Sequence, residues 1–237
     1  MNNLKDKVAY ITGGSKGIGF GIASKLLKAG MKVAISSRLL ENAENAAKEL
    51  GPEDMVLAVA SDVSKLGDEQ AAVNKILDKW GKLDVMVANA GVGHFAPIDQ
   101  ISDTLWHEMV NTNLNGVFHS LKASVEALKK SKGYYITVAS LAGTNFFANG
   151  AGYNATKFGV VGFTQAAMLD LRPYDIKVST IMPGSVATNF NGHEPSKEDA
   201  WKIQPEDIGE LVLDLLNMNP RTLPSKIEVR PTRPDKK

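Results

Sequence analysis

The chain has 237 residues, with 27 basic and 26 acidic side chains and a formal net charge of +1. This even balance argues against a basic nucleic-acid face or a polybasic membrane anchor. The absence of cysteine excludes disulfides, thiolate catalysis and cysteine-based zinc sites. The N-terminus is polar and the chain has no apolar run of membrane-spanning length, so we expect a cytoplasmic protein. With no linker-like segment inside it, residues 1–237 are predicted to form one α/β domain.

Short apolar runs alternate with amphipathic stretches along the chain. Because the runs are apolar at successive positions, they are typical of a parallel sheet covered by helices on both faces. The predicted strands are residues 8–11, 32–36, 55–59, 85–88, 133–138, 177–181 and 226–229. The predicted helices are residues 17–29, 40–50, 69–80, 102–130, 152–171 and 206–216. This alternation predicts right-handed crossovers and a doubly wound parallel sheet of about seven strands.

The first predicted strand is followed by a glycine-rich turn, Thr12-Gly13-Gly14-Ser15-Lys16-Gly17-Ile18-Gly19. Glycines let the backbone approach a pyrophosphate closely, and the helix that follows offers unpaired N–H groups and the positive end of its dipole. The glycines are spaced more widely than in the G-x-G-x-x-G dinucleotide pattern, so the turn alone leaves a merely flexible connection open. Ligands of open α/β sheets bind at the carboxyl ends of the strands, and this position favours a phosphate site.

The Thr-Gly-x-x-x-Gly-Ile-Gly pattern resembles the short-chain dehydrogenase/reductase family, and the likeness extends over about residues 5–190. It implies a Rossmann fold and an oxidoreductase that moves hydride between a nicotinamide dinucleotide and a carbonyl or alcohol. The resemblance assigns cofactor contacts in the turn to Gly13, Ser15, Lys16, Gly17, Ile18 and Gly19. It assigns further contacts at later strand ends to Asp62, Val63, Asn89, Ala90, Gly91, Pro183, Gly184, Val186 and Thr188.

The end of the second predicted strand, Ser36-Ser37-Arg38, bears on the choice of cofactor. NAD-using folds place an acidic residue there, whereas an arginine accommodates the 2′-phosphate of NADP. Ser37 stands where NAD-preferring members of the family carry Asp. Arg38 offers a fork of donors to phosphate oxygens, and Lys16 is a second cation within reach. Either cation alone would most often be a solvated surface charge, but both together favour NADP(H), with NAD(H) as the alternative.

Tyr153 and Lys157 are four residues apart, so a helix would place the phenol and the ammonium on one face. Reduction of a carbonyl needs a proton donor for the developing alkoxide. A tyrosine has an ordinary pKa of about 10, and a lysine cation together with oxidised nicotinamide should lower it. The spacing alone is common in surface helices. The resemblance adds Ser140, which orients the substrate, and Asn113, which holds a water linking Lys157 to a proton relay. It also has Tyr153 and Lys157 contact the cofactor, with Lys157 on the nicotinamide ribose.

The residues expected to border the substrate are largely aromatic. The resemblance points to His94, Phe95, Phe147 and Phe190, each of which could equally serve only in packing. The four histidines have no metal-ligand spacing, so no metal site is expected. The substrate loop, residues 186–205, is short for the family, which predicts a relatively open site.

Two further expectations concern assembly and the C-terminus. The C-terminus lacks the family's usual glycine-rich ending, which puts a tetramer in doubt, while the long predicted helices suit a dimer contact; a homodimer or homotetramer is expected. The tail, residues 230–237, is expected to be solvated.

Three functions remain open. The first is a general NADP(H)-dependent carbonyl reductase acting on a small-molecule carbonyl or alcohol, with no nucleic-acid or membrane partner. The second is a 3-oxoacyl-(acyl-carrier-protein) reductase, which a basic docking patch beside the cleft would favour. The third is a dinucleotide-binding sensor without catalysis. Such proteins typically lose the tyrosine or the lysine, and this chain keeps both.

Overall fold

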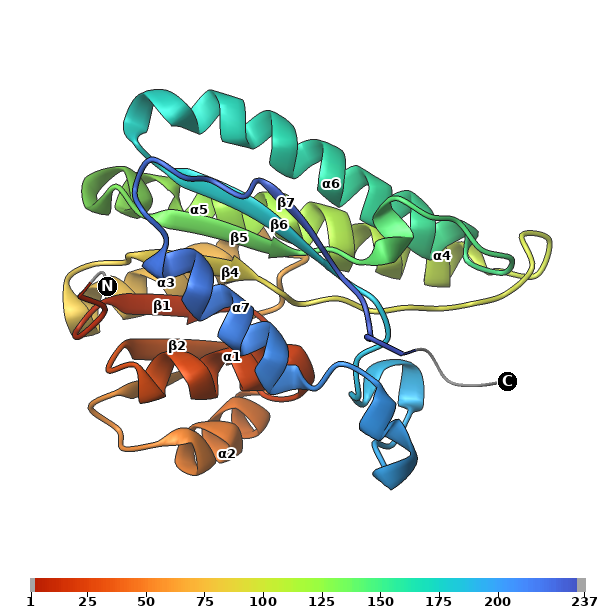
Figure 1. The fold of residues 1–237 in the computed structure, drawn as a ribbon, viewed down its shortest axis with the longest axis horizontal. Coiled ribbons are helices and arrows are strands. Elements are labelled where there is room, and N and C mark those ends of the chain that lie inside the picture. Colours follow the sequence, from red (N-terminus) through yellow and green to blue (C-terminus); the bar gives the residue numbers. More distant parts are fainter. Residues whose placement is uncertain (1–2, 234–237) are drawn as a thin grey trace.

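The apolar runs of the sequence pair side by side as parallel strands in the computed structural model, which describes residues 3–233 (Figure 1). The strands are β1 (Val8–Ile11), β2 (Lys32–Ser37), β3 (Val56–Ala60), β4 (Val85–Ala88), β5 (Tyr134–Val138), β6 (Lys177–Pro183) and β7 (Lys226–Val229). The described residues form a 7-stranded sheet in the order β3-β2-β1-β4-β5-β6-β7. The predicted doubly wound sheet is confirmed. The strand order reverses between β1 and β4, which is where sheets of this kind open a ligand crevice.

Helices cover both faces of the sheet. They are α1 (Gly17–Lys28), α2 (Leu40–Leu50), α3 (Leu66–Trp80), α4 (Asp103–Met109), α5 (Gly116–Ser131), α6 (Ala151–Leu171) and α7 (Pro205–Asn217). Alternate side chains of each strand enter opposite layers. Ala9 and Ile11 pack with apolar residues of α1, α2 and α7. Val8 and Tyr10 pack with those of α3, α5 and α6. Both layers consist mainly of apolar side chains, as the unbroken apolar strands require.

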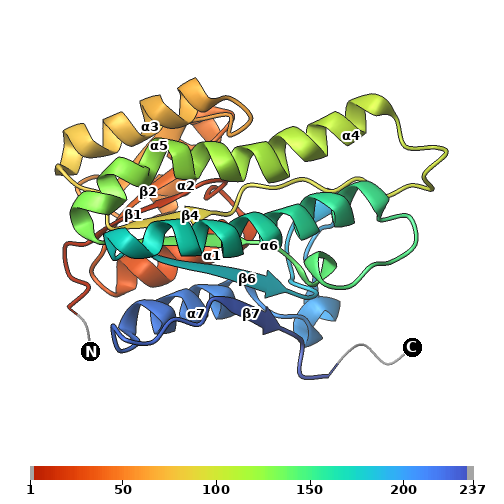
Figure 2. The same cartoon turned by 90° about the horizontal axis from the view of Figure 1, so that it is seen from above.

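The prediction of one continuous helix over residues 102–130 is wrong in one respect. A π-helical turn, Val110–Asn115, separates α4 from α5, although Figure 2 shows the two helices running on in nearly one line. The turn lies where the Asn113 side chain is bonded to the loop after β4, and this bonding accounts for the local widening. π-Turns are rare and often mark functional sites. The other main difference is α3, which begins three residues before the predicted start.

Among the described residues of the predicted tail, Arg230, Thr232 and Arg233 are exposed and Pro231 is half-buried, in keeping with the expected solvation. Arg230 and Pro231, at the start of the predicted tail, line the cleft described below. Residues 234–237 of that tail lie outside the described residues. Over residues 3–233, no helix has the combination of length and apolarity that crossing a bilayer requires.

Candidate active site

The carboxyl ends of the strands border a cleft of about 1710 Å³. Most of the residues predicted for the site line it, from the glycine turn and the ends of β2, β3 and β4 to Tyr153, Lys157 and the loop after β6. Three predicted residues do not line the cleft: Gly19 and Asn113 are buried, and Phe95 is 40% exposed. The cleft is larger than a typical small-molecule pocket, as a site for both a dinucleotide and a substrate must be.

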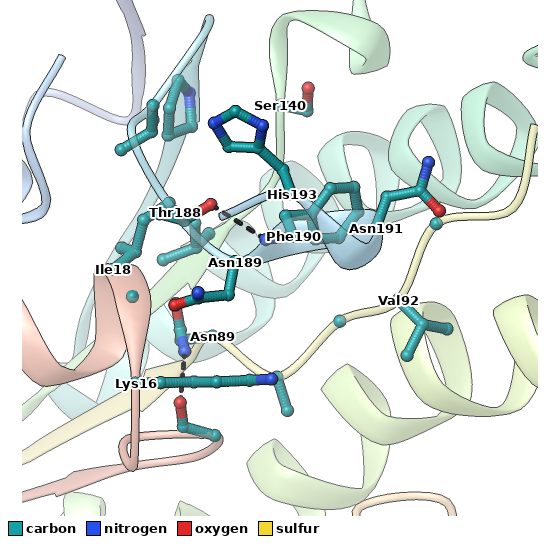
Figure 3. A pocket seen from close by; sticks show the side chains of 18 of the residues that line it. Lys16, Ile18, Asn89, Val92, Ser140, Thr188, Asn189, Phe190, Asn191 and His193 are labelled. Carbon is teal, nitrogen blue, oxygen red and sulfur yellow. Dashed lines mark hydrogen bonds between the residues drawn. The ribbon is translucent and has the colours of Figure 1, made fainter. Parts of the chain in front are cut away.

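The glycine turn forms a rigid cradle at the start of α1. Gly13 and Gly17 have φ values of +62° and +56°, a left-handed conformation that glycine adopts without strain. Asn89 braces the turn, because its Nδ2 donates to Thr12 O at 2.9 Å and to Gly13 O at 3.2 Å (Figure 3). A Cβ on Gly19 would lie 2.6 Å from the same Nδ2, so Gly19 supports the turn from behind.

The cradle fits a dinucleotide pyrophosphate. The N-terminus of α1 meets the cleft with Lys16 at the N-cap in an extended conformation (φ −161°, ψ 170°). The first N–H groups of a helix lack intrahelical partners and attract anions. A Cβ on Gly17 would lie 3.3 Å from Thr188 Cγ2, so the turn and the loop after β6 face each other across a narrow passage. Side chains in place of these glycines would fill that passage.

Arg38, at the end of β2, is only loosely held. Its Nη1 lies 3.8 Å from Glu108 Oε1, and its side chain is 70% exposed. Glu108 also contacts His94, with Oε2 2.9 Å from Nε2. Glu108 was not predicted for the site. It approaches Arg38 only through the fold, since 70 residues separate the two in the sequence.

Asp62 has its carboxylate already engaged. It accepts hydrogen bonds from Ser64 N at 3.1 Å and Ser64 Oγ at 2.7 Å, and Lys65 Nζ lies 3.7 Å away. Partial burial opposes ionisation of Asp62, but the Ser64 bonds and Lys65 outweigh it and lower the pKa. A carboxylate held in this way gives the end of β3 a fixed shape beside the cleft.

Tyr153 and Lys157 lie on α6 at the floor of the cleft, 9% and 5% exposed. Lys157 Nζ donates to Val138 O, the last residue of β5, at 3.0 Å, and lies 5.6 Å from the centroid of the Tyr153 ring. A Cβ on Gly91 would lie 3.6 Å from Nζ, so glycine at that position leaves room for the ammonium. Ser140 follows β5 and caps a short 3₁₀ turn through Ala142 N at 3.1 Å. The predicted Ser140, Tyr153 and Lys157 therefore meet in one place.

Burial controls the protonation of both groups. It raises the pKa of Tyr153 to about 12, and a hydrogen bond with Ser140 only partly offsets this. Burial likewise lowers the pKa of Lys157 to about 8. The expected lowering of the tyrosine's pKa is thus not produced by the lysine, because both side chains have lost water and each favours its neutral form. The expected lowering of the Tyr153 pKa would have to come from the positive charge of an oxidised nicotinamide, which the chain does not itself supply.

Asn113 serves as a brace between three segments. Its Oδ1 accepts from Val92 N at 2.8 Å, and its Nδ2 donates to Val92 O at 2.8 Å and to Thr156 Oγ1 at 3.1 Å. Both amide hydrogens are therefore used to tie the loop after β4 to α6. The neighbouring Asn111 and Asn115 are exposed and bonded to each other at 2.9 Å, so Asn113 alone faces inward, as the helical spacing predicted.

Comparison with known proteins identifies the family. The family model described as "short chain dehydrogenase" matches residues 7–199.

The chain belongs to the short-chain dehydrogenase family, which is a family of oxidoreductases.

It is 32% identical over 228 residues to trans-4-hydroxycyclohexanecarboxylate dehydrogenase of Sinomonas cyclohexanicum, covering 90% of this chain and 87% of that one. Two solved structures are each 32% identical to it. One is an alcohol dehydrogenase of Thermococcus sibiricus complexed with 5-hydroxy-NADP (TM-score 0.90, covering 98% of this chain and 100% of that one). The other is a 3-ketoacyl-(acyl-carrier-protein) reductase of Brucella melitensis complexed with NADH (TM-score 0.89, covering 97% and 99%).

In this short-chain dehydrogenase, three phenylalanines gather beside Tyr153. Phe95 lies edge-on to the Tyr153 ring, with centroids 5.5 Å apart and an interplanar angle of 77°. Phe190 lies 5.7 Å from Tyr153, and Phe147 lies 5.7 Å from Phe95. The predicted phenylalanines are therefore brought together, and each of them is partly exposed to solvent.

The substrate loop is more structured than its length predicted. It carries two 3₁₀ turns, Phe190–Gly192 and Lys197–Trp201, and a parallel bridge between Val186 and Ile203 closes its base. Asp199 holds the interior of the loop through His193 Nε2 at 2.6 Å and Lys202 Nζ at 2.5 Å. Hydrogen bonds from Lys202, His193 and Ser196 hold the pKa of Asp199 well below its usual range. Phe190 and Tyr153 both line the cleft, with ring centroids 5.7 Å apart, and the expectation of a relatively open site stays a prediction.

Within residues 3–233, no three His, Asp or Glu side chains gather as a metal site would require.

Proposed function

We propose that this short-chain dehydrogenase transfers hydride between NADP(H) and a carbonyl or alcohol, with Tyr153 as the general acid and base. The observation that carries the proposal is the meeting of Tyr153, Ser140 and Lys157 at the floor of a cleft that also opens onto the glycine cradle. A phosphate-binding turn and a buried proton donor in one cleft supply the two ends of a hydride-transfer site.

The residues of the cradle would hold the pyrophosphate, and Thr188 and the Val186 backbone, in the loop after β6, would hold the carboxamide. When bound, the nicotinamide supplies or accepts the hydride. In the direction of reduction, the carbonyl carbon would gain the hydride and its two electrons from the bound cofactor, and Tyr153 would donate the proton that completes the hydroxyl. The Ser140 hydroxyl can both donate and accept, so it holds the substrate oxygen against Tyr153.

Lys157 restores the proton on Tyr153. With a pKa of about 8, the lysine lies close to the pH at which it must exchange a proton. Its Nζ approaches Gly91, one residue before the Val92 that Asn113 braces. We propose that Asn113 fixes this loop and so keeps open the path along which water reaches the lysine.

The preference for NADP(H) rests on two cations. Arg38 is exposed and only weakly paired, so its donors are available to a 2′-phosphate, and Lys16 lines the same cleft. The end of β2 offers no carboxylate to repel that phosphate. Similar structures carry either form of the cofactor: the Thermococcus sibiricus dehydrogenase holds an NADP derivative and the Brucella melitensis reductase holds NADH.

The preference predicts opposite effects for two substitutions. Arg38→Ala should raise the KM for NADPH by about tenfold and leave that for NADH nearly unchanged, because a charge-assisted bond to phosphate is lost. Glu108→Gln removes a carboxylate beside Arg38 and should lower the KM for NADPH by about two- to threefold, a small effect because the pair is exposed. Steady-state kinetics with both cofactors measures this, and an unchanged NADPH preference in Arg38→Ala would refute the assignment.

A 3-oxoacyl-(acyl-carrier-protein) reductase is the second candidate, favoured by the likeness to the Brucella melitensis enzyme. A catalytically inactive sensor is disfavoured by the intact Tyr153 and Lys157. For the partners, we propose a small-molecule substrate, no nucleic acid or membrane, and a homodimer or homotetramer. Large apolar side chains exposed on α5 and α6, Phe118, Phe158 and Leu169, support self-association through these helices.

A cofactor-oxidation screen tests the proposed function. Purified protein should consume NADPH with at least one member of a panel of aldehydes, ketones, 3-oxo esters and 3-oxoacyl thioesters. Fluorescence titration of NADPH in the same preparation separates the alternatives. Tight NADPH binding with no consumption across the panel would favour the sensor, whereas turnover confined to the 3-oxoacyl thioesters would favour the acyl-carrier-protein reductase.

A further inference from the structure

The Phe190 ring is seated beside the proton donor. A Cβ on Gly93 would lie 2.5 Å from Phe190 Cζ, so the tip of the ring rests directly on the Gly93 backbone. The ring is 5.7 Å from Tyr153 and 6.5 Å from Phe95, centroid to centroid. A six-membered ring is therefore accommodated beside the Tyr153 ring.

A second glycine makes room for a second ring. A Cβ on Gly150 would lie 2.5 Å from Phe147 Cε2, so Phe147 also rests on a glycine backbone. Phe147 is 48% exposed and lines the cleft, and the Phe95 ring, which is 40% exposed, packs against it with the ring centroids 5.7 Å apart. Together Phe95, Phe147 and Phe190 form an aromatic wall, the name used below for these three residues.

The backbone around Phe190 would allow the ring to move away from its contact with Gly93. It belongs to a 3₁₀ turn in which Asn191 and Gly192 both have left-handed backbones, with φ values of 55° and 75°. Its amide donates to Thr188 Oγ1 over 3.4 Å, a long bond drawn in Figure 3. Packing, rather than strong hydrogen bonds, therefore keeps the ring in place.

The charges around the cleft argue against an anionic substrate. Apart from Lys16, Arg38 and the buried Lys157, the described basic side chains that line it each contact a carboxylate: His94 on Glu108, His193 and Lys202 on Asp199, and Arg230 on Glu228. Lys16 and Arg38 are assigned to the cofactor phosphate. A substrate carboxylate or phosphate would have to break one of these pairs.

We propose that the site selects neutral ketones or secondary alcohols whose reacting carbon lies in, or next to, a six-membered ring. The substrate ring takes the place beside Tyr153 that the Phe190 ring occupies, and Phe190 turns outward to cover its far face against Phe95 and Phe147. This inference rests on the proposed function and adds to it the class of substrate.

The test compares ketones of equal carbon number. Cyclohexyl methyl ketone and 2-octanone have the same number of carbons and differ in the ring, so the ratio of their kcat/KM values isolates the effect of the ring. The aromatic wall should favour cyclohexyl methyl ketone by about tenfold or more, which corresponds to about 1.4 kcal/mol of aromatic and apolar contact. Phe190→Ala should bring the ratio close to one. The matched control is Tyr174→Leu, an exposed aromatic residue outside the cleft, which should leave the ratio unchanged.

The outcomes separate the two proposals. If the kcat/KM for 2-octanone or for a 3-oxoacyl thioester equals that for cyclohexyl methyl ketone, the ring selectivity is refuted while the proposed function stands. The same holds if Phe190→Ala retains the wild-type ratio. If no member of the wider carbonyl panel consumes NADPH, the proposed function itself fails and the ring selectivity fails with it.

Discussion

At the scale of single residues, the site depends on burial more than on attraction between charges. Tyr153 and Lys157 are four positions apart on α6, and the sequence predicted from this spacing that they share one face of a helix. The sequence did not predict that both side chains lose water on folding. This burial raises the pKa of Tyr153 to about 12 and lowers that of Lys157 to about 8. A buried lysine that ionises near neutrality has a cost for the fold, because its cation has lost hydration.

Lys157→Met should therefore stabilise the protein while abolishing turnover. The folded-state pKa of about 8 lies below the ordinary 10.5, so between these values the unfolded chain binds more protons and stability rises with pH. Below pH 8 the wild type carries the full cost of the buried cation. The variant should be more stable at pH 7 by about 2 kcal/mol, and its advantage should shrink as the pH rises toward 10.5.

Urea unfolding at pH 7 and pH 10 measures this difference, with the exposed Lys75→Met as the control. A Lys157→Met variant that is less stable than the wild type at pH 7, or whose advantage does not change with pH, would show that the hydrogen bond to Val138 outweighs the cost of burying the charge.

At the scale of elements, the π-turn and the internal structure of the substrate loop were not foreseen. The run Asn111-Thr112-Asn113-Leu114-Asn115 consists largely of weak helix formers, and that was a signal of an irregular helix. The partner of Asn113 is Val92, 21 residues away, and local pattern does not encode such a contact. The predicted substrate loop, residues 186–205, falls in the connection between Pro183, where β6 ends, and Pro205, where α7 begins. Its internal fastening around Asp199 depends on side chains that meet only after folding.

Asp199→Asn should loosen the substrate loop and leave the sheet unaffected. The substitution removes the charge that binds Lys202 and His193 while keeping an oxygen for the Ser196 amide. Faster amide exchange is expected over residues 190–202, together with a higher KM for the ketone and a smaller change in kcat, because Phe190 is then less well positioned.

Hydrogen-exchange mass spectrometry measures that effect. Glu126→Gln, which breaks an exposed pair with Lys129, provides the control. Equal exchange in the loops of wild type and Asp199→Asn would mean that packing alone holds the segment.

At the scale of the whole molecule, the order of elements and the doubly wound sheet followed from the sequence, because continuous apolar strands can be buried only between two helical layers. The meeting of the glycine turn with the ends of β2, β3 and β4 at one cleft followed as well, since the carboxyl ends of parallel strands meet at one edge. Contacts between polar side chains that are distant in the sequence could not be predicted from it. Arg38 with Glu108 is one, and Glu69 with Tyr10 and Ser61 is another, with Tyr10 Oη 2.9 Å from Glu69 Oε1.

Glu69→Gln should flatten the pH dependence of stability. Burial raises the pKa of Glu69 above its ordinary 4.5, although bonds from Ser61 and Tyr10 partly oppose this. The folded chain therefore binds more protons than the unfolded chain from pH 4.5 up to the raised value, and stability falls as the pH rises through that window. A glutamine side chain at this position cannot titrate, so melting temperatures measured from pH 4 to pH 8 should change less in the variant. An identical profile in both proteins would place the titration elsewhere.

The central claim is that Tyr153 transfers the proton that accompanies hydride transfer, and Tyr153→Phe tests it most directly. The substitution removes one hydroxyl and leaves the ring that packs on Phe95 and Phe190. Steady-state reduction of the best ketone should fall in kcat by about 10²- to 10⁴-fold, the usual contribution of a positioned proton donor. The Kd for NADPH, measured by fluorescence titration, should stay within about twofold of wild type, since the cradle is untouched. A Tyr153→Phe variant that reduces the ketone at the wild-type rate would contradict the account.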